Sequence, residues 1–210
     1  MNGKLAIMGR TLSRVELYAL GFLILTFVIT FAIRVSGPLE DGDLWFHLEY
    51  GEYFLDHHTL IPDHSLYSWT PADKSAIYCA WGAEIIFYTL NQLGGLKALY
   101  ILRYLFALVY LVLVIYQSRK YKILGSNIPW MLAGIGIVMS QAGIMIKPAI
   151  YSYVFMTITV WIWWDNKIPR YKNVSFYLLP VVFILWVNAH GGVIFGVVYL
   201  SLLFIGEALS

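Results

Sequence analysis

The stretch LYALGFLILTFVITFAIRV, residues 17–35, decides the fold class of this chain. It carries no charged residue before Arg34, and its length matches the ~20 apolar residues with which an α-helix crosses the hydrocarbon core of a bilayer. The composition of the whole chain agrees with this helix. The 210 residues are 60% hydrophobic and only 12% charged, whereas a soluble domain has about 25% charged residues. We therefore predict an all-α, polytopic membrane protein whose outside is solvated by lipid.

Further apolar segments bring the predicted number of transmembrane helices to about six. Three of them cover residues 96–116, 128–146 and 149–164. The last apolar stretch, residues 174–209, would form a helix about 54 Å long, which is too long for one crossing. Because Asn188-Ala189-His190-Gly191-Gly192 interrupts this stretch near its middle, we predict a break there between a fifth and a sixth span.

The distribution of charge orients these spans. Basic residues gather before the first span, after the second and after the fourth, so all three clusters fall on one side, which the positive-inside rule makes the cytoplasm. They are Lys4, Arg10 and Arg14, then Arg119, Lys120 and Lys122, then Lys167, Arg170 and Lys172. The stretch between spans one and two carries most of the 12 acidic residues and is predicted to lie outside. Since the basic residues form no continuous face, no nucleic-acid partner is expected.

Residues 36–95 form this first outer loop, and we predict that it is structured. Residues 43–56 show helical spacing, with apolar side chains on one face and acidic side chains on another. Residues 81–93 form a second amphipathic candidate, which Gly94-Gly95 closes as a helix stop. Both segments are rich in aromatic residues, as is typical of helices that lie at the level of the lipid headgroups.

Asp41-Gly42-Asp43 lies just beyond the outer end of the first span. Two carboxylates this close could take a proton from an acceptor hydroxyl, or hold a divalent cation, whose identity the sequence leaves unknown. The alternative is that Asp43 is the N-cap of the helix that follows. His47 lies one turn later on the same side of that helix and is either part of the same site or an ordinary interfacial histidine.

Four other polar residues have two interpretations each. Lys147, before Pro148, either reaches the interface or pairs with a lipid phosphate. Arg103, inside the second span, either reaches past the interface or binds an anionic group. Asn188 and His190 either hydrogen-bond to a neighbouring span or bind a polar ligand at the exposed ends of two half-helices. The predicted topology places Asp41, Asp43, Lys147, Asn188 and His190 on one side of the membrane, which indicates a polar site there.

Two separated motifs then resemble a known family. The first is Asp41-Gly42-Asp43-Leu44-Trp45-Phe46-His47-Leu48, followed by Gly51, Ile61-Pro62, Ser68, Trp81, Glu84 and Gly94-Gly95. The second is Trp186-Val187-Asn188-Ala189-His190-Gly191-Gly192, with Gly196 after it. In this order they resemble bacterial membrane glycosyltransferases of the GT-C fold, similar to dolichyl-phosphate-mannose-protein mannosyltransferases. The match runs from the first span to the last residue.

The resemblance implies a single GT-C-like transmembrane domain over residues 1–210. Its activity would be to move a sugar from a polyprenyl-phosphate carrier to an acceptor hydroxyl outside the cytoplasm. The family's catalytic carboxylate lies in the first outer loop, where Asp43 is the better match and Asp41 the second. Lys147 stands where many relatives carry arginine, so the charge is kept but the bidentate fork is lost. The expected substrate-binding residues are His47, Trp45, Trp81, Glu84, Arg103, Lys147, Asn188 and His190.

Members of this family are longer, so the resemblance also implies that the chain is the N-terminal portion of such a fold. The partner expected on this basis is a second polytopic chain that completes the fold. The expected location is the plasma membrane, with a cytoplasmic N-terminus. Two alternative functions stay open. One is a catalytically inactive or split scaffold or assembly subunit of the same fold. The other is a transporter, because broken helices with polar residues also line permeation paths.

Overall fold

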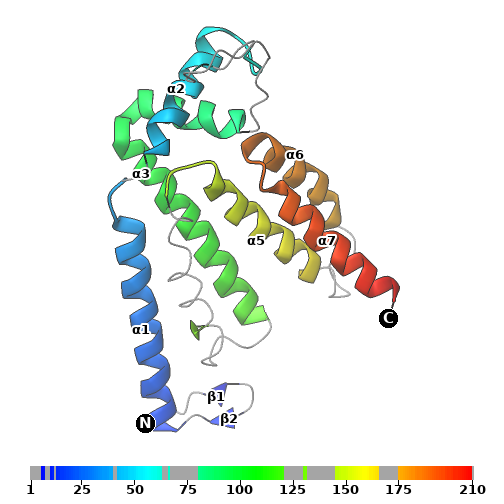
Figure 1. Ribbon diagram of the computed structural model, residues 1–210. Coiled ribbons are helices and arrows are strands. Elements are labelled where there is room, and N and C mark those ends of the chain that lie inside the picture. The colour runs from blue at the N-terminus through cyan, green and yellow to red at the C-terminus, as the bar shows by residue number, and fades with distance from the viewer. Residues whose placement is uncertain are drawn as a thin grey trace. The chain divides into compact units, whose positions relative to one another are not determined.

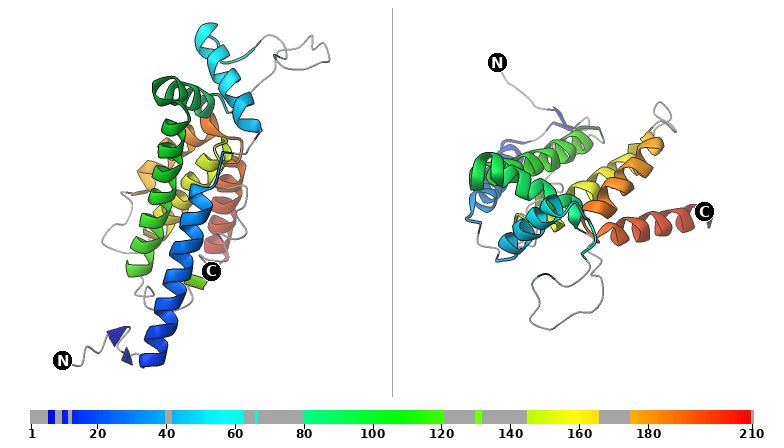
Figure 2. Two further views of the ribbon diagram at one scale, coloured as in Figure 1. Left: turned by 90° about the vertical axis from the view of Figure 1, so that its left-hand side faces the viewer. Right: turned by 90° about the horizontal axis from the view of Figure 1, so that it is seen from above.

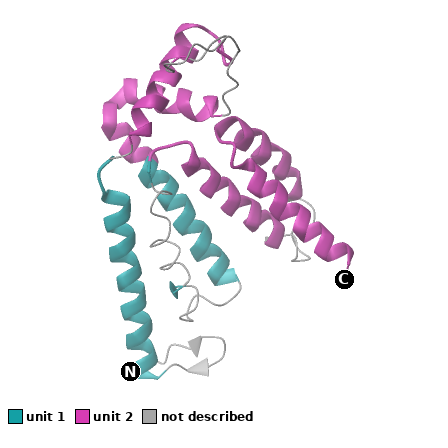
Figure 3. Ribbon diagram, viewed as in Figure 1, with its two compact units in different colours: residues 1–39, 103–145 teal, residues 40–102, 146–210 magenta. Residues whose placement is uncertain are grey.

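The computed structural model describes residues 6–7, 10–11, 13–39, 42–62, 66, 80–120, 130–131, 145–165 and 175–209 (Figure 1). Almost all of these residues are helical, which confirms the all-α fold class. The β-structure among them is one antiparallel pair of two-residue strands, β1 (Ala6–Ile7) and β2 (Arg10–Thr11). The chain divides into two compact units, residues 1–39 with 103–145 and residues 40–102 with 146–210 (Figure 3).

The first unit is built on α1 (Arg14–Ser36), which contains the apolar stretch of residues 17–35. A reciprocal capping box begins this helix, because Ser13 Oγ accepts from the Glu16 N–H at 3.2 Å and Glu16 Oε2 accepts from the Ser13 N–H at 2.8 Å. Further along, Phe27 is buried among Phe31, Leu111 and Trp130. Its ring centroid lies 5.4 Å from that of Trp130, in an edge-to-face arrangement.

Two of the described helices, α1 and α3 (Trp81–Lys120), are long and apolar enough to cross a membrane. In each of them only 11% of the most apolar window is buried. α5 (Ala149–Asp165), α6 (Leu179–Ala189) and α7 (Val193–Ala208) are apolar but shorter, with 17, 11 and 16 residues. The total of about six spans therefore stays a prediction, and its third member, residues 128–146, lies mostly outside the described residues.

The predicted helix stop after residue 93 is confirmed within α3. Gly95 has φ 59° and ψ −155°, which is not a helical conformation and which suits glycine because it has no Cβ. The helix before Gly95 is therefore the second predicted helix of the outer loop. The helix after it covers the predicted second span.

The second unit contains α2 (Asp43–Asp56), the first part of α3, α5, the 3-10 helix η2 (Ser175–Leu178), α6 and α7. α5 and α6 run side by side, and α7 contacts both (Figure 2). Only residues 190–192 separate α6 from α7, so the predicted break in the last apolar stretch is confirmed. In Figure 1, α2 and the first part of α3 lie above this break and above the beginning of α5.

The contact between α2 and α3 depends on a glycine. A Cβ atom on Gly51 would lie 2.6 Å from the Tyr88 Cβ and closer still to the Glu84 carbonyl oxygen. The absence of a side chain thus lets the two helices approach until their backbones meet. On one side of this contact, the Tyr88 hydroxyl donates to Glu52 Oε1 at 3.0 Å.

We expect Gly51→Ala to destabilise the second unit, because the new methyl group has no room between α2 and α3. Overpacking of this kind lowers the free energy of unfolding by about 1–3 kcal/mol. The matched control is Gly21→Ala, since a Cβ on Gly21 in α1 meets nothing within 4 Å. Thermal unfolding in detergent, followed by circular dichroism, should show a lower midpoint for the first variant only. Equal midpoints for the two variants would contradict the close contact.

Candidate functional site

The first element of the candidate site is the beginning of α2. Gly42 occupies the N-cap position, and Asp43 is the first residue with helical geometry, so the N-cap interpretation of Asp43 is wrong. The exposed Asp43 carboxylate instead lies in the first turn, where the helix dipole stabilises negative charge. Asp41 lies outside the described residues, and with it the carboxylate pair and the cation that this pair could hold.

One turn later, His47 forms a buried pair with Glu84. The His47 Nδ1 atom lies 2.7 Å from Glu84 Oε1, and Glu84 is fully buried at 0% exposure. An ionised carboxylate only accepts hydrogen bonds, so Nδ1 of His47 is the donor. The two residues come from α2 and α3, which means that this bond also ties the two helices together. Both were predicted as site residues, but their contact was not.

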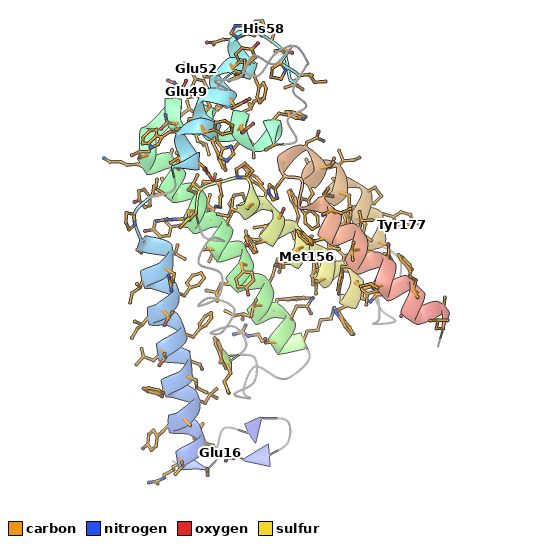
Figure 4. The ribbon with its side chains drawn as sticks, in the orientation of Figure 1. Glu16, Glu49, Glu52, His58, Met156 and Tyr177 are labelled. Atoms are coloured by element: carbon orange, nitrogen blue, oxygen red, sulfur yellow. The ribbon has the colours of Figure 1, made fainter. Side chains whose placement is uncertain are left out.

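Two tyrosines on the same two helices have raised pKa values. Burial, and then the negative charge of Glu84, raises the pKa of Tyr50 on α2. The hydrogen bond to Glu52 is the main reason why the pKa of Tyr88 on α3 is also raised. Both hydroxyls therefore stay protonated at neutral pH, and that of Tyr88 donates to Glu52. Glu49 and Glu52 follow one another along α2, and His58 lies just beyond its end (Figure 4).

The second element is the break between α6 and α7, where a chain of hydrogen bonds holds His190. Trp186 Nε1 donates to Ser152 Oγ at 2.7 Å, and Ser152 Oγ lies 2.7 Å from His190 Nδ1. The Gly192 N–H donates to the same Nδ1 atom at 3.1 Å. A Cβ on Gly192 would lie 2.7 Å from this atom, so only glycine leaves the ring in place. Sequence reasoning did not single out Ser152.

The two elements meet within the second unit. A Cβ on Gly82, at the start of α3, would lie 2.8 Å from the carbonyl oxygen of Asn188, at the end of α6. Nearby, the rings of Phe87 and Tyr151 pack with their centroids 5.8 Å apart. Burial is the main reason why the pKa of His190 is lowered, and a positive charge on the protonated form of His47 lowers it further, so the two imidazoles lie within electrostatic range of each other. Residues from the two sequence motifs thus share one region of the fold.

Other predicted site residues of this unit have more ordinary surroundings. Trp45 is exposed on α2, and Trp81 is half-buried as the first residue of α3. The Asn188 side-chain amide donates to the Ile184 carbonyl of its own helix at 2.7 Å. Lys147 lies two residues before α5, and its carbonyl accepts from the Ile150 N–H at 2.9 Å. A role of these side chains in binding a substrate stays a prediction.

Arg103 belongs to the first unit and is buried there. Its Nη2 donates to the carbonyl of Gly37, which follows the last residue of α1. Cations stabilise the carbonyl-rich end of a helix, so this contact explains how an arginine is accommodated within an apolar segment. The contact is a third possibility that the two sequence-based interpretations did not include.

No metal centre is defined by the part of the chain that the structure describes. Within it, no group of three or more histidine, cysteine, aspartate or glutamate side chains could hold a metal ion. Comparisons with known proteins also give no assignment. No family model matches the chain, and neither a curated protein nor a solved structure is significantly similar to it.

We expect Glu84→Ala to lower the free energy of unfolding by about 3 kcal/mol, because it leaves the buried Nδ1–H of His47 without an acceptor. The matched control is Glu49→Ala on the exposed face of α2, where the change should stay within about 0.5 kcal/mol. Denaturant or thermal unfolding of the two purified variants measures the difference. A Glu84→Ala protein as stable as the control would show that the buried pair does not hold α2 on α3.

Proposed function

We propose that this chain is a membrane glycosyltransferase of the GT-C type, which moves a sugar from a polyprenyl-phosphate carrier to an acceptor hydroxyl. The observation that supports this most is the meeting of its two sequence motifs. Gly82 of the first motif region lies against Asn188 of the second, and His47 and His190 are electrostatic neighbours. Segments more than a hundred residues apart in the sequence thus contribute to one polar site, as a shared substrate requires.

The proposed setting is a plasma membrane that the chain crosses about six times, with the N-terminus in the cytoplasm and the site outside. The exposed apolar side chains of α1 and α3 support a lipid environment, since each Å² of apolar surface left in water costs about 25 cal/mol. The three basic clusters support the orientation. The break between α6 and α7 then faces the same side as α2.

In the proposed reaction, Asp43 is the general base. Its carboxylate takes the proton of the acceptor hydroxyl while the hydroxyl oxygen attacks the anomeric carbon of the donor sugar. The bond between that carbon and the phosphate oxygen breaks, and the electron pair leaves with the polyprenyl phosphate. Exposure of Asp43 at the first turn of α2 suits a base that must reach a second substrate. Lys147, in the same unit, is assigned to the departing phosphate.

The test is sugar transfer by the purified chain in liposomes that contain a polyprenyl-phosphate-linked sugar and a panel of acceptors. Asp43→Asn keeps the size of the side chain but removes the base, so transfer should fall by roughly 10²–10⁴-fold. Asp56→Asn, at the other end of α2, is the matched control and should keep the rate of the natural chain. Full turnover of Asp43→Asn would refute the role of Asp43. Absence of transfer by the natural chain with every donor and acceptor would refute the proposed function.

A further inference from the structure

The two histidines of the site use the same ring nitrogen, Nδ1, in opposite ways, one as a hydrogen-bond donor and the other as an acceptor. His47 uses its Nδ1 to donate to the Glu84 carboxylate. In the neutral form of His47 this is the ring's one proton, so the Nε2 atom carries a lone pair and is an acceptor. His190 uses its Nδ1 in the other sense. The Gly192 backbone N–H can only donate to it, so the Nδ1 of His190 is an acceptor and its proton lies on Nε2.

Ser152 and Trp186 also favour the tautomer of His190 in which Nδ1 is the acceptor and Nε2 carries the proton. The indole N–H of Trp186 fills one acceptor site of the Ser152 hydroxyl, which leaves the hydroxyl proton to point at His190 Nδ1. Two donors therefore converge on the same nitrogen. Burial further disfavours the doubly protonated ring, in which this nitrogen could not accept.

The Nε2 atom is therefore the nitrogen of each ring that these hydrogen bonds leave for a ligand. Among the residues that the structure describes, the hydrogen bonds of His47 and His190 all run through Nδ1. The site consequently offers one acceptor, on His47, and one donor, on His190. An anion would need donors on both rings, and a cation would need acceptors on both. A group of hydroxyls satisfies both rings, because each hydroxyl donates one bond and accepts others.

We propose that His47 and His190 form a subsite for the hydroxyl groups of a sugar. One hydroxyl donates to Nε2 of His47, and a second hydroxyl of the same sugar accepts from the Nε2–H of His190. Glu84, Ser152 and Trp186 are positioning residues that set the proton on each ring. The subsite rests on the proposed function only for the identity of the ligand, since the opposite states of the rings follow from their hydrogen bonds.

Nitrogen NMR of the ¹⁵N-histidine-labelled chain in nanodiscs tests the ring states without any turnover. The signals of the two residues are assigned with His47→Gln and His190→Gln. At neutral pH we expect the proton on Nδ1 in His47 and on Nε2 in His190. In the Ser152→Ala protein the signals of His190 should shift toward a mixture of both forms, while those of His47 stay unchanged. The same tautomer for both rings would overturn the proposal.

Three probes then test the ligand. They are polyprenyl phosphate without a sugar, the same lipid carrying a hexose, and a free methyl hexoside. We expect the Nε2 signals of both rings to move with a sugar-bearing probe and not with the bare lipid phosphate. Movement with the lipid-linked hexose assigns the subsite to the donor sugar, and movement with the free hexoside assigns it to the acceptor. Equal movement with bare polyprenyl phosphate, or none with any probe, would overturn the subsite.

Two variants of His190 distinguish the hydrogen-bond donor role of its Nε2–H from the effect of its packing. The side-chain amide of glutamine reaches the position of Nε2 and that of asparagine only the position of Nδ1, so His190→Gln should keep binding whereas His190→Asn should weaken it about tenfold. His58→Asn, outside the site, is the control and should bind as the natural chain does. Equal loss in both His190 variants would contradict the donor role. Sugar binding without transfer would refute the proposed function and leave the subsite standing.

Discussion

The hydrogen bond between His47 and the fully buried Glu84 is the interaction on which the rest of the site depends. A carboxylate without a partner is very costly to bury, so Glu84 requires a donor, and α2 must stay on α3 to supply it. The close contact at Gly51 fixes the same pair of helices from their backbones. The His47–Glu84 hydrogen bond and Gly51 therefore fix the position of the outer-loop motif. The hydrogen bond also fixes the orientation of the His47 ring and leaves Nε2 as the nitrogen available to a ligand.

Glycines also bring the second motif to the first. Gly82 allows the start of α3 to touch the end of α6, and Gly192 leaves the room that the His190 ring occupies beside Ser152. At Gly196 a Cβ would lie 2.9 Å from Cη2 of the Trp186 indole and closer still to its Cζ3, so this glycine keeps the indole where it can donate to Ser152. Packing thus explains Gly51 in the first motif and Gly192 and Gly196 in the second, and the polar chemistry that they permit is concentrated on His47 and His190.

Local patterns predicted the elements well, and contacts between distant residues poorly. The helix at residues 43–56, the stop at Gly94-Gly95 and the break near residue 190 were predictable because periodicity and glycine act over a few residues. The pairing of His47 with Glu84 was not, because nothing in either segment specifies its partner. Ser152 lies in an apolar run where a lone hydroxyl carries no periodic signal. The N-cap was misplaced by one residue because Gly42 and Asp43 are both acceptable at that position.

The central claim, that the start of α3 lies against the end of α6, is tested most directly by a disulfide bond. An ideal Cβ on Gly82 lies 3.7 Å from the Asn188 Cβ, close to the ~3.8 Å typical of disulfides. The new Cβ on residue 82 also lies 2.8 Å from the carbonyl oxygen of residue 188, so the two segments must shift slightly apart, which leaves them within reach of a disulfide. The chain with Gly82→Cys, Asn188→Cys and Cys79→Ser should therefore cross-link in its native membrane under mild oxidation and return to normal gel mobility on reduction. The control pairs Gly82→Cys with Tyr177→Cys, which lies about 16 Å from residue 188 along η2 and α6. Cross-linking no faster than in this control would contradict the account.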